Sequence, residues 1–164
     1  MPLLMIAAGS GISGIHATLQ ERLAWAKKGY EVGEAKLLFG LQNKNKDFIY
    51  QEALAEFQKE GILTDIVLAE SRPDVGTKQY VQHYLMKGAF SQELKEIAAE
   101  ERGIVLCGDW RMGQSVLFGV LPFLLPLPSG RKGGDISQLN SEALEAVFTE
   151  GKELVVALRE NRTI

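Results

Sequence analysis

The chain has 164 residues, a formal net charge of −3 and a single cysteine, Cys107. Its weakly acidic balance argues against a nucleic-acid binder that works through its overall field, and no stretch approaches the roughly 20 apolar residues of a membrane helix. The length is that of one globular domain, which we expect over residues 1–164. A single cysteine excludes an internal disulfide and favours a reducing compartment, so we expect the protein in the cytoplasm.

Short apolar runs alternate with helix-period segments along the chain, which is typical of an α/β protein with a parallel sheet. A helix is expected after the glycine-rich turn at 9–14 because apolar residues recur there at three and four positions. The first expected elements are a strand at 3–8, that turn and helix, a strand at 35–40, a helix at 48–59 capped by Asp47, and a strand at 63–70. A helix at 80–87 and a helix capped by Ser91 and running to about 102 come next, followed by a strand at 103–108 and another helix. The remaining chain is expected to form an irregular proline-containing stretch at 122–134, a helix at 141–151 and a last strand at "ELVVALR". This order predicts a doubly wound, Rossmann-like parallel sheet of about five strands with helices on both faces.

The unusual segments of the sequence all follow the carboxyl ends of predicted strands. In doubly wound sheets, ligands bind at that edge, where the strand order reverses. We therefore expect one composite site there, built from "GSGISG", "GLQNKNK", "SRPDVGTKQYVQ" and "CGDWRM". His16 and His83 show no metal-ligand spacing, so no metal site is expected, and Trp25 and Trp110 are interpreted as packing residues.

The first of these segments places Gly9, Gly11 and Gly14 in the pattern G-x-G-x-x-G between a strand and a helix. Glycines at such a turn let backbone N–H groups approach a pyrophosphate, and the helix N-terminus favours negative charge. An ordinary strand-to-helix turn is the alternative. The dinucleotide pattern also needs an acid at the end of the second strand, and "FGLQNKNK" offers none, so the standard NAD pattern is incomplete.

The loop at 71–82 offers a different way to hold the ribose end of a nucleotide. Arg72 can bind a phosphate with two hydrogen bonds, Ser71 can donate its hydroxyl hydrogen, and Lys78 adds a point charge. Tyr80 offers a flat face to an adenine ring, and Gln82 offers an amide. These residues suit an extra phosphate on an adenosine ribose, and the alternative is a solvated loop that leads into a helix.

Four segments in this order resemble the NADPH-binding domain of the ferredoxin–NADP reductase family, most closely its diflavin reductases. They cover the chain from about residue 3 to 120: "GSGISGIHATLQER", "LFGLQNKNKDFIYQEALAEF", "SRPDVGTKQYVQH" and "CGDWRM" are similar to G-T-G-I-A-P-F-R-G-F-L-Q-E-R, F-G-C-R…D-F-L-Y-x-E-E-L, S-R…K-x-Y-V-Q-H and C-G-D-A-R-x-M. The resemblance implies NADP(H) as cofactor and hydride transfer to an FAD.

The resemblance also assigns roles to single residues. It implies that Gly9, Ser10 and Gly11 lie along the pyrophosphate, that Ser71, Arg72 and Lys78 hold the 2′-phosphate, that Tyr80 and Gln82 meet the adenosine, and that Cys107, Gly108 and Asp109 form the edge beside the nicotinamide. Cys107 and Asp109 are the catalytic candidates. From the residues alone, Cys107 also fits a small buried apolar residue, and Asp109 fits a helix N-cap.

The sequence departs from the family pattern at several positions. Gly14 replaces a proline, His16 and Gln42 stand where arginines are common, and the aromatic residue expected near the C-terminus is missing from "GKELVVALRENRTI". The flavin-binding barrel is also absent from this chain, so FAD is expected on an upstream or separate domain, with a downstream electron-acceptor protein as a further partner. The isolated chain is then expected to bind NADPH without turnover.

Two functions are consistent with these features, and a third is less favoured. The intact Cys107-Gly108-Asp109 segment favours the NADPH domain of a flavoprotein reductase. The altered terminus and the missing arginines at 16 and 42 favour a reductase-like module that binds NADP(H) and has lost catalysis. A Rossmann-like domain with another ligand is disfavoured by the segment from Ser71 to Gln82.

Overall fold

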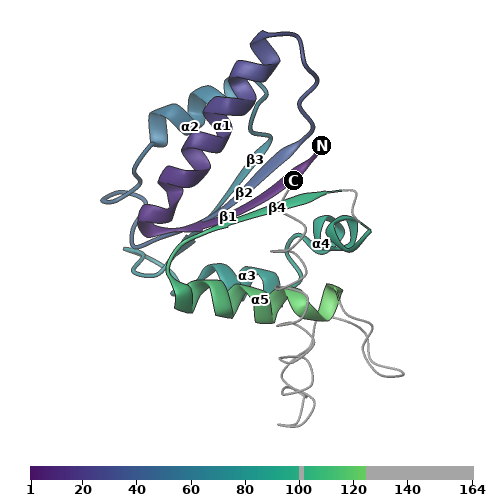
Figure 1. Cartoon of the computed structure of the whole chain (residues 1–164). Coiled ribbons are helices and arrows are strands. Elements are labelled where there is room, and N and C mark those ends of the chain that lie inside the picture. Colours follow the sequence, from purple (N-terminus) through teal and green to yellow (C-terminus); the bar gives the residue numbers. More distant parts are fainter. Residues whose placement is uncertain (100–101, 125–164) are drawn as a thin grey trace.

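The computed structural model describes residues 1–99 and 102–124, which form one parallel sheet with helices on both faces (Figure 1). The sheet has four described strands in the order β3-β2-β1-β4. Their bounds are Leu3–Ala8 for β1, Ala35–Leu41 for β2, Asp65–Glu70 for β3 and Gly103–Cys107 for β4. The predicted doubly wound α/β architecture is confirmed.

The two inner strands, β1 and β2, are buried on both faces, and their alternating side chains divide between two cores. On β1, Met5 and Ala7 belong to one core, whereas Leu4 and Ile6 belong to the other. All four side chains are fully buried, as expected for a strand covered on both faces. Each fully buried aliphatic side chain of this kind contributes about 1.5–3 kcal/mol of transfer free energy.

The helices form two layers, one against each core. Helices α1 and α2 cover the face with Met5, and helices α3, α4 and α5 cover the face with Leu4 (Figure 1). Their bounds are Ile12–Lys27 for α1, Gln51–Lys59 for α2, Val81–Met86 for α3, Ser91–Ala98 for α4 and Trp110–Leu124 for α5, with a short 3-10 turn at Gly9–Gly11 before α1.

Two predicted helix boundaries are wrong. Helix α2 begins at Gln51 rather than at residue 48, and Asp47 does not cap it because the Asp47 carboxylate accepts hydrogen bonds from the backbone N–H groups of Gln42 and Asn43. Helix α4 follows Phe90, which has a left-handed backbone (φ 63°), so Ser91 is its first residue rather than its cap, and the helix ends at Ala98.

The predicted fifth strand, "ELVVALR", and the helix at 141–151 lie outside the described residues. Helix α5 extends to Leu124, so the stretch at 122–134 begins as helix rather than as irregular chain. Trp25 and Trp110 are 47% and 76% exposed, which makes their interpretation as packing residues wrong. Within residues 1–99 and 102–124, no helix is both long and apolar enough to cross a bilayer.

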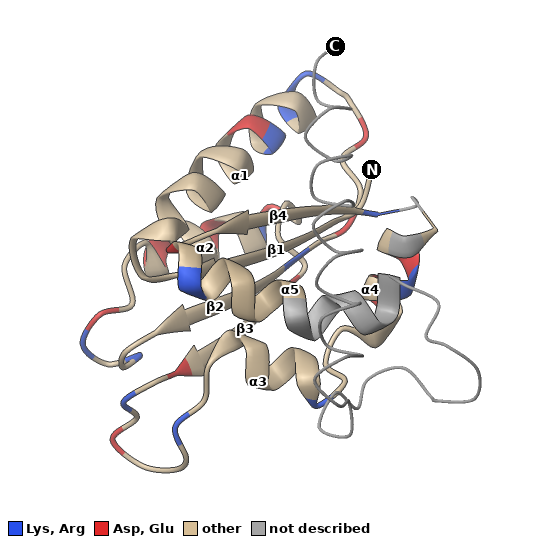
Figure 2. Ribbon diagram, turned by 60° about the horizontal axis from the view of Figure 1, so that its bottom comes forward, with Lys and Arg blue, Asp and Glu red and all other residues tan. Residues whose placement is uncertain are grey.

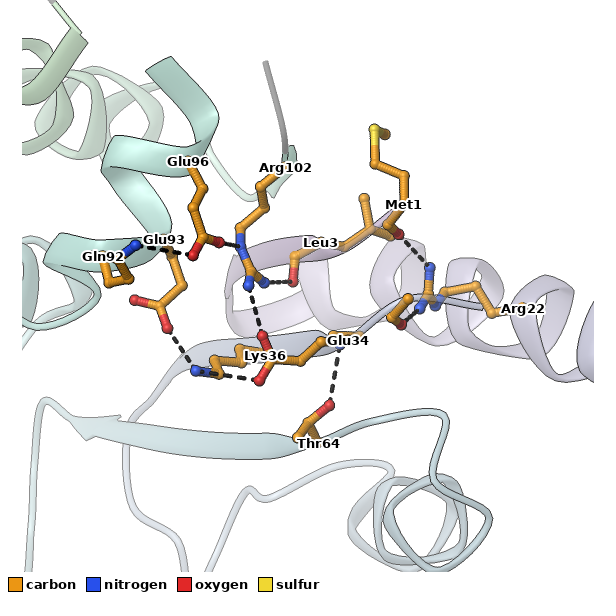
Figure 3. A network of polar contacts seen from close by, with 12 residues as sticks. Met1, Leu3, Arg22, Glu34, Lys36, Thr64, Gln92, Glu93, Glu96 and Arg102 are labelled. Carbon is orange, nitrogen blue, oxygen red and sulfur yellow. Dashed lines mark hydrogen bonds and ion pairs between the residues drawn. The ribbon is translucent and has the colours of Figure 1, made fainter. Parts of the chain in front are cut away.

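A network of charged side chains lies along the amino edge of the sheet (Figure 3). The side chain of Arg102 is 5% exposed, and it donates to Glu96 at 2.7 Å, to Glu34 at 2.6 Å and to the carbonyl oxygen of Leu3 at 3.4 Å. Lys36 joins the network through Glu34 at 3.4 Å and Glu93 at 2.5 Å. These contacts tie α4 to the starts of β1, β2 and β4.

Candidate nucleotide site at the carboxyl edge of the sheet

The order of the strands places a topological switch between β1 and β4. The chain moves from β1 outward to β2 and β3 along one side, and it then returns to β4 on the other side of β1 (Figure 1). Ala7 and Cys107 are register partners at the carboxyl ends of these two strands. The glycine turn and the segment "GDW" therefore leave the sheet next to each other, at the position where doubly wound sheets bind ligands.

The glycine turn follows the backbone of β4 very closely. A Cβ atom on Gly11 would overlap the carbonyl oxygen of Cys107, and a Cβ atom on Gly14 would lie 2.9 Å from its Sγ. Gly9 has the opposite environment: its backbone is left-handed (φ +54°), and an added Cβ would meet nothing within 4 Å. Gly11 is thus required by packing, whereas Gly9 leaves open space above the turn.

The beginning of α1 is open to an anion. Helix α1 is 16 residues long, and no described side chain makes a capping hydrogen bond at Gly11, its N-cap. The free backbone N–H groups of a first helical turn carry partial positive charge and bind phosphate groups well. Ser10 and Gly9 are both exposed beside this turn. The geometry is therefore suited to a pyrophosphate.

A cavity of about 460 Å³ opens at this edge of the sheet, between the exits of the strands and the first turns of α3 and α5. It brings together five of the predicted site residues, namely Gly9, Ser71, Tyr80, Gln82 and Asp109. Its remaining lining comes from Ala8, Gly40, Leu41, Gln42, Asp47, Ala69, Val81, Arg111, Met112 and Ser115. Segments that are far apart in the sequence thus form one concave surface, as ligand sites require.

Arg72 lies outside that cavity and lines a neighbouring one of about 240 Å³, together with Gln42, Asn43, Lys46 and Asp47. Its Nη1 atom donates to Oε1 of Gln42 at 3.2 Å. Ser71 lines the larger cavity instead, and its hydroxyl donates to the carbonyl oxygen of Leu41 at 3.3 Å. Both cavities share Gln42 and Asp47, so they are adjacent parts of one site.

Charged residues of both signs lie on the loops at this edge of the sheet (Figure 2), and three lysines there each contact a neighbouring group. Lys46 lies 3.1 Å from Asp74, Lys44 lies 3.8 Å from Glu70, and Nζ of Lys78 lies 4.8 Å above the centre of the Tyr80 ring. Hydrogen bonds from Asn45 and then from Lys46 lower the pKa of Asp74. These contacts are exposed, so they are weak enough to exchange for contacts with a bound anion.

The two catalytic candidates, Cys107 and Asp109, lie in different surroundings. The side chain of Cys107 packs against the core under α1, beside Gly14, and it does not line either described cavity. Asp109 lines the larger cavity, and its Oδ1 also accepts the N–H of Met112 at 2.9 Å. The predicted capping role of Asp109 is confirmed, and Gly108 is exposed between these two residues.

Several residues that line the two cavities were given no individual role from the sequence, and Arg111, Asn43 and Asp47 are among them. Arg111 lines the larger cavity, and its signal was present in the segment "CGDWRM", where it follows the acid by two positions. Asn43 and Asp47 line the smaller cavity, and both carry hydrogen bonds inside the loop at 42–47. Loop hydrogen bonds of this kind have no periodicity, so no pattern in the sequence indicated the roles of Asn43 and Asp47.

Comparisons with known proteins place the chain among nucleotide-binding oxidoreductase domains. Residues 5–117 match the family model described as "Oxidoreductase NAD-binding domain". The chain is 37% identical over 110 residues to NADPH–cytochrome P450 reductase of Cavia porcellus and 34% identical over 110 residues to that of Homo sapiens. These matches cover 67% of this chain and 16% of each relative.

A further relative is a nitric oxide synthase. The chain is 33% identical over 116 residues to inducible nitric oxide synthase of Sus scrofa, which covers 70% of this chain and 10% of that protein. The predicted resemblance to the diflavin reductases is confirmed by these matches. The chain spans less than a fifth of the length of the relatives that it matches.

Proposed function

The chain belongs to the family of oxidoreductase NAD-binding domains, and on that premise we propose that it binds NADP(H) for a flavoprotein reductase. In this proposal NADPH supplies a hydride, and an FAD on another domain accepts it. Residues 1–164 form the single nucleotide-binding domain, and a separate acceptor protein takes electrons from the flavin. The observation that carries the proposal is the glycine turn beside a cationic loop at the switch point of the sheet.

The pyrophosphate is assigned to the turn before α1. Gly9, Ser10 and Gly11 present backbone N–H groups there, and the open space above Gly9 leaves room for a ligand. His16 follows one helical turn later, and its ring stacks on Tyr50 with centroids 4.4 Å apart. This stacking supports a packing role for His16, so the anion is held mainly by the backbone and the helix dipole.

The 2′-phosphoadenosine end is assigned to the loop after β3. Ser71, Arg72 and Lys78 supply the donors for the 2′-phosphate, and a guanidinium suits a phosphate because it donates two parallel hydrogen bonds. Tyr80 and Gln82 line the larger cavity and meet the adenosine. The contact of Lys78 with the Tyr80 ring supports this grouping, since it holds the cation beside the surface on which the base would stack.

The nicotinamide is assigned to the edge formed by Cys107, Gly108 and Asp109. Hydride transfer needs a donor and an acceptor carbon held about 3–3.5 Å apart, so the residues here act by shape and by exclusion of water rather than by covalent attack. Gly108 and Asp109 are exposed at this edge. Arg111 on α5 adds a cation to the wall of the same cavity.

The alternative of a binding module without catalysis gains no support from the described residues. One of its reasons, the altered C-terminal segment, lies outside them. The other two reasons are the missing arginines at positions 16 and 42. Both side chains that stand there make contacts in the structure, His16 with Tyr50 and Gln42 with Arg72. The relatives named above are reductases and a synthase.

The first experiment is a calorimetric titration of the chain with 2′,5′-ADP and with 5′-AMP, repeated with Arg72→Ala. We expect 2′,5′-ADP to bind much more tightly than 5′-AMP. Arg72→Ala should lower the affinity for 2′,5′-ADP at least tenfold, since a charge-assisted hydrogen bond contributes about 1.5–3 kcal/mol. The control Lys59→Ala removes an exposed cation from α2, far from the site, and should leave both affinities unchanged.

Equal binding of the two nucleotides would reject the preference for a 2′-phosphate and reduce the proposal to membership of the family. Hydride transfer needs a second test, in which the chain is joined to a flavin-binding domain of a diflavin reductase. NADPH-dependent reduction of ferricyanide by that fusion is the expected result. Binding of NADPH without any such reduction would favour the binding module.

A further inference from the structure

Among residues 1–99 and 102–124, Asn43 is the one buried asparagine, and 3% of its surface is exposed. It lies in the loop after β2, whereas Arg72, one of the residues assigned to the 2′-phosphate, lies in the loop after β3. Buried polar side chains are retained where their hydrogen bonds fix a particular arrangement, because burial without partners is costly. The partners of Asn43 therefore indicate what it holds in place.

The loop that carries Asn43 is folded around Asp47. The two carboxylate oxygens of Asp47 accept the backbone N–H groups of Gln42 at 2.9 Å and of Asn43 at 2.6 Å. The carbonyl oxygen of Asn43 in turn accepts the N–H groups of Lys46 at 3.1 Å and Asp47 at 3.0 Å. The Asn43 backbone is thus fixed within its own loop before its side chain makes any contact.

The side chain of Asn43 joins this loop to Arg72. Its Nδ2 donates to the carbonyl oxygen of Arg72 at 3.1 Å, and its Oδ1 accepts the N–H of Asn45 at 2.9 Å. Gln42 holds Arg72 from the same loop, since its carbonyl oxygen accepts the Arg72 N–H at 2.7 Å and its Oε1 accepts Nη1 at 3.2 Å. The Arg72 backbone is therefore held on both its N–H and its C=O side.

We propose that Asn43 is a positioning residue that fixes Arg72 at the smaller cavity and thereby sets the preference for a nucleotide with a 2′-phosphate. The inference rests on the proposed function and adds a residue that acts through Arg72 rather than on the ligand. A guanidinium discriminates by geometry, so a displaced backbone at residue 72 should weaken recognition of the phosphate more than recognition of the remaining nucleotide.

The test measures the ratio of the affinities for 2′,5′-ADP and 5′-AMP in the wild type and in Asn43→Ala, Arg72→Ala and the double variant. Asn43→Ala should reduce the ratio about fivefold, and it should have no further effect once Arg72 is alanine. The matched control is Asn45→Ala, which removes an exposed contact to Asp74 at 3.1 Å and should change the ratio less than twofold.

The outcomes separate the inference from the proposed function. A wild type without preference for 2′,5′-ADP overturns both. A wild type with this preference and an unchanged ratio in Asn43→Ala overturns the inference alone, and so does an equal drop with and without Arg72.

A second variant covers the case in which Asn43→Ala does not fold. Asn43→Asp keeps the size and the acceptor atom but loses the Nδ2 donor, and Asn45→Asp adds the same charge two residues away. A larger drop in the ratio for Asn43→Asp than for Asn45→Asp supports the inference, and equal drops overturn it.

Discussion

The two edges of the sheet hold an arginine in opposite ways. At the amino edge, the Arg102 side chain is 5% exposed and donates to two carboxylates and one carbonyl group. At the carboxyl edge, Arg72 is exposed and its guanidinium donates to one neutral side chain, that of Gln42. The charge of Arg102 is satisfied inside the protein, whereas the charge of Arg72 stays available to a ligand. The difference shows that contacts which stabilise the fold lie at the amino ends of the strands, whereas side chains available for binding lie at their carboxyl ends.

The largest expected effect is an exception to this separation, because Gly11 lies at the binding edge and also matters for stability. A methyl group there would overlap the carbonyl oxygen of Cys107, and backbone cannot move aside cheaply. We expect Gly11→Ala to lower the free energy of unfolding by about 3 kcal/mol, measured by urea denaturation. Gly9→Ala is the control, with a cost of about 1 kcal/mol from its left-handed backbone alone. Equal effects of the two changes would contradict the close approach of the turn to β4.

The next effect tests the amino edge directly. Arg102→Leu leaves Glu34 and Glu96 without their shared cation, and both carboxylates are partly exposed, so part of the loss is recovered by water. We expect the free energy of unfolding to fall by about 2 kcal/mol, with no change in nucleotide affinity. Lys95→Leu removes an exposed cation from α4, the helix that carries Glu96, and serves as the control. A loss as small as that of the control would show that the network contributes nothing to stability.

The fold was more predictable from the sequence than the site was. Strand positions and the two-sided cores follow from apolar runs such as "LLMIAA", because burial imposes that pattern directly. The sequence also predicted the glycine turn and the loop of Arg72 as site segments. It did not indicate that Asp47 folds the loop at 42–47 rather than capping α2, since both roles use the same carboxylate and only the path of the chain decides between them.

A smaller effect is expected at the carboxyl edge. Gln42→Glu replaces the neutral partner of Arg72 with a carboxylate, which competes with a phosphate for the guanidinium. The affinity for 2′,5′-ADP should fall about tenfold, equivalent to about 1.4 kcal/mol, with little change for 5′-AMP. Gln58→Glu adds the same charge on the exposed side of α2 and controls for net charge. A tenfold loss for both nucleotides would argue against a specific effect on the 2′-phosphate.

The smallest effect is a pH dependence of stability at the amino edge. Hydrogen bonding to Arg102 lowers the pKa of Glu34, and Lys36 adds to this shift. A carboxyl group with a lowered pKa in the folded state stabilises the protein above its unfolded pKa, and this stabilisation is lost as the pH falls through the folded value. We expect the free energy of unfolding to fall below about pH 5, and to fall less steeply in Arg102→Leu, because only Lys36 then lowers the pKa of Glu34. Parallel pH profiles for the two proteins would exclude this origin.

The hydrogen bonds between the loops after β2 and β3 also have a consequence for the motions of the protein. The N–H groups of Ser71 and Arg72 continue the ladder of the two strands beyond their ends, to the carbonyl oxygens of Leu41 and Gln42. An amide in such a pair exchanges its hydrogen with solvent only when both loops separate. The amides of Ser71 and Arg72 should therefore show similar protection and exchange together, although nearly 30 residues of chain lie between the two loops.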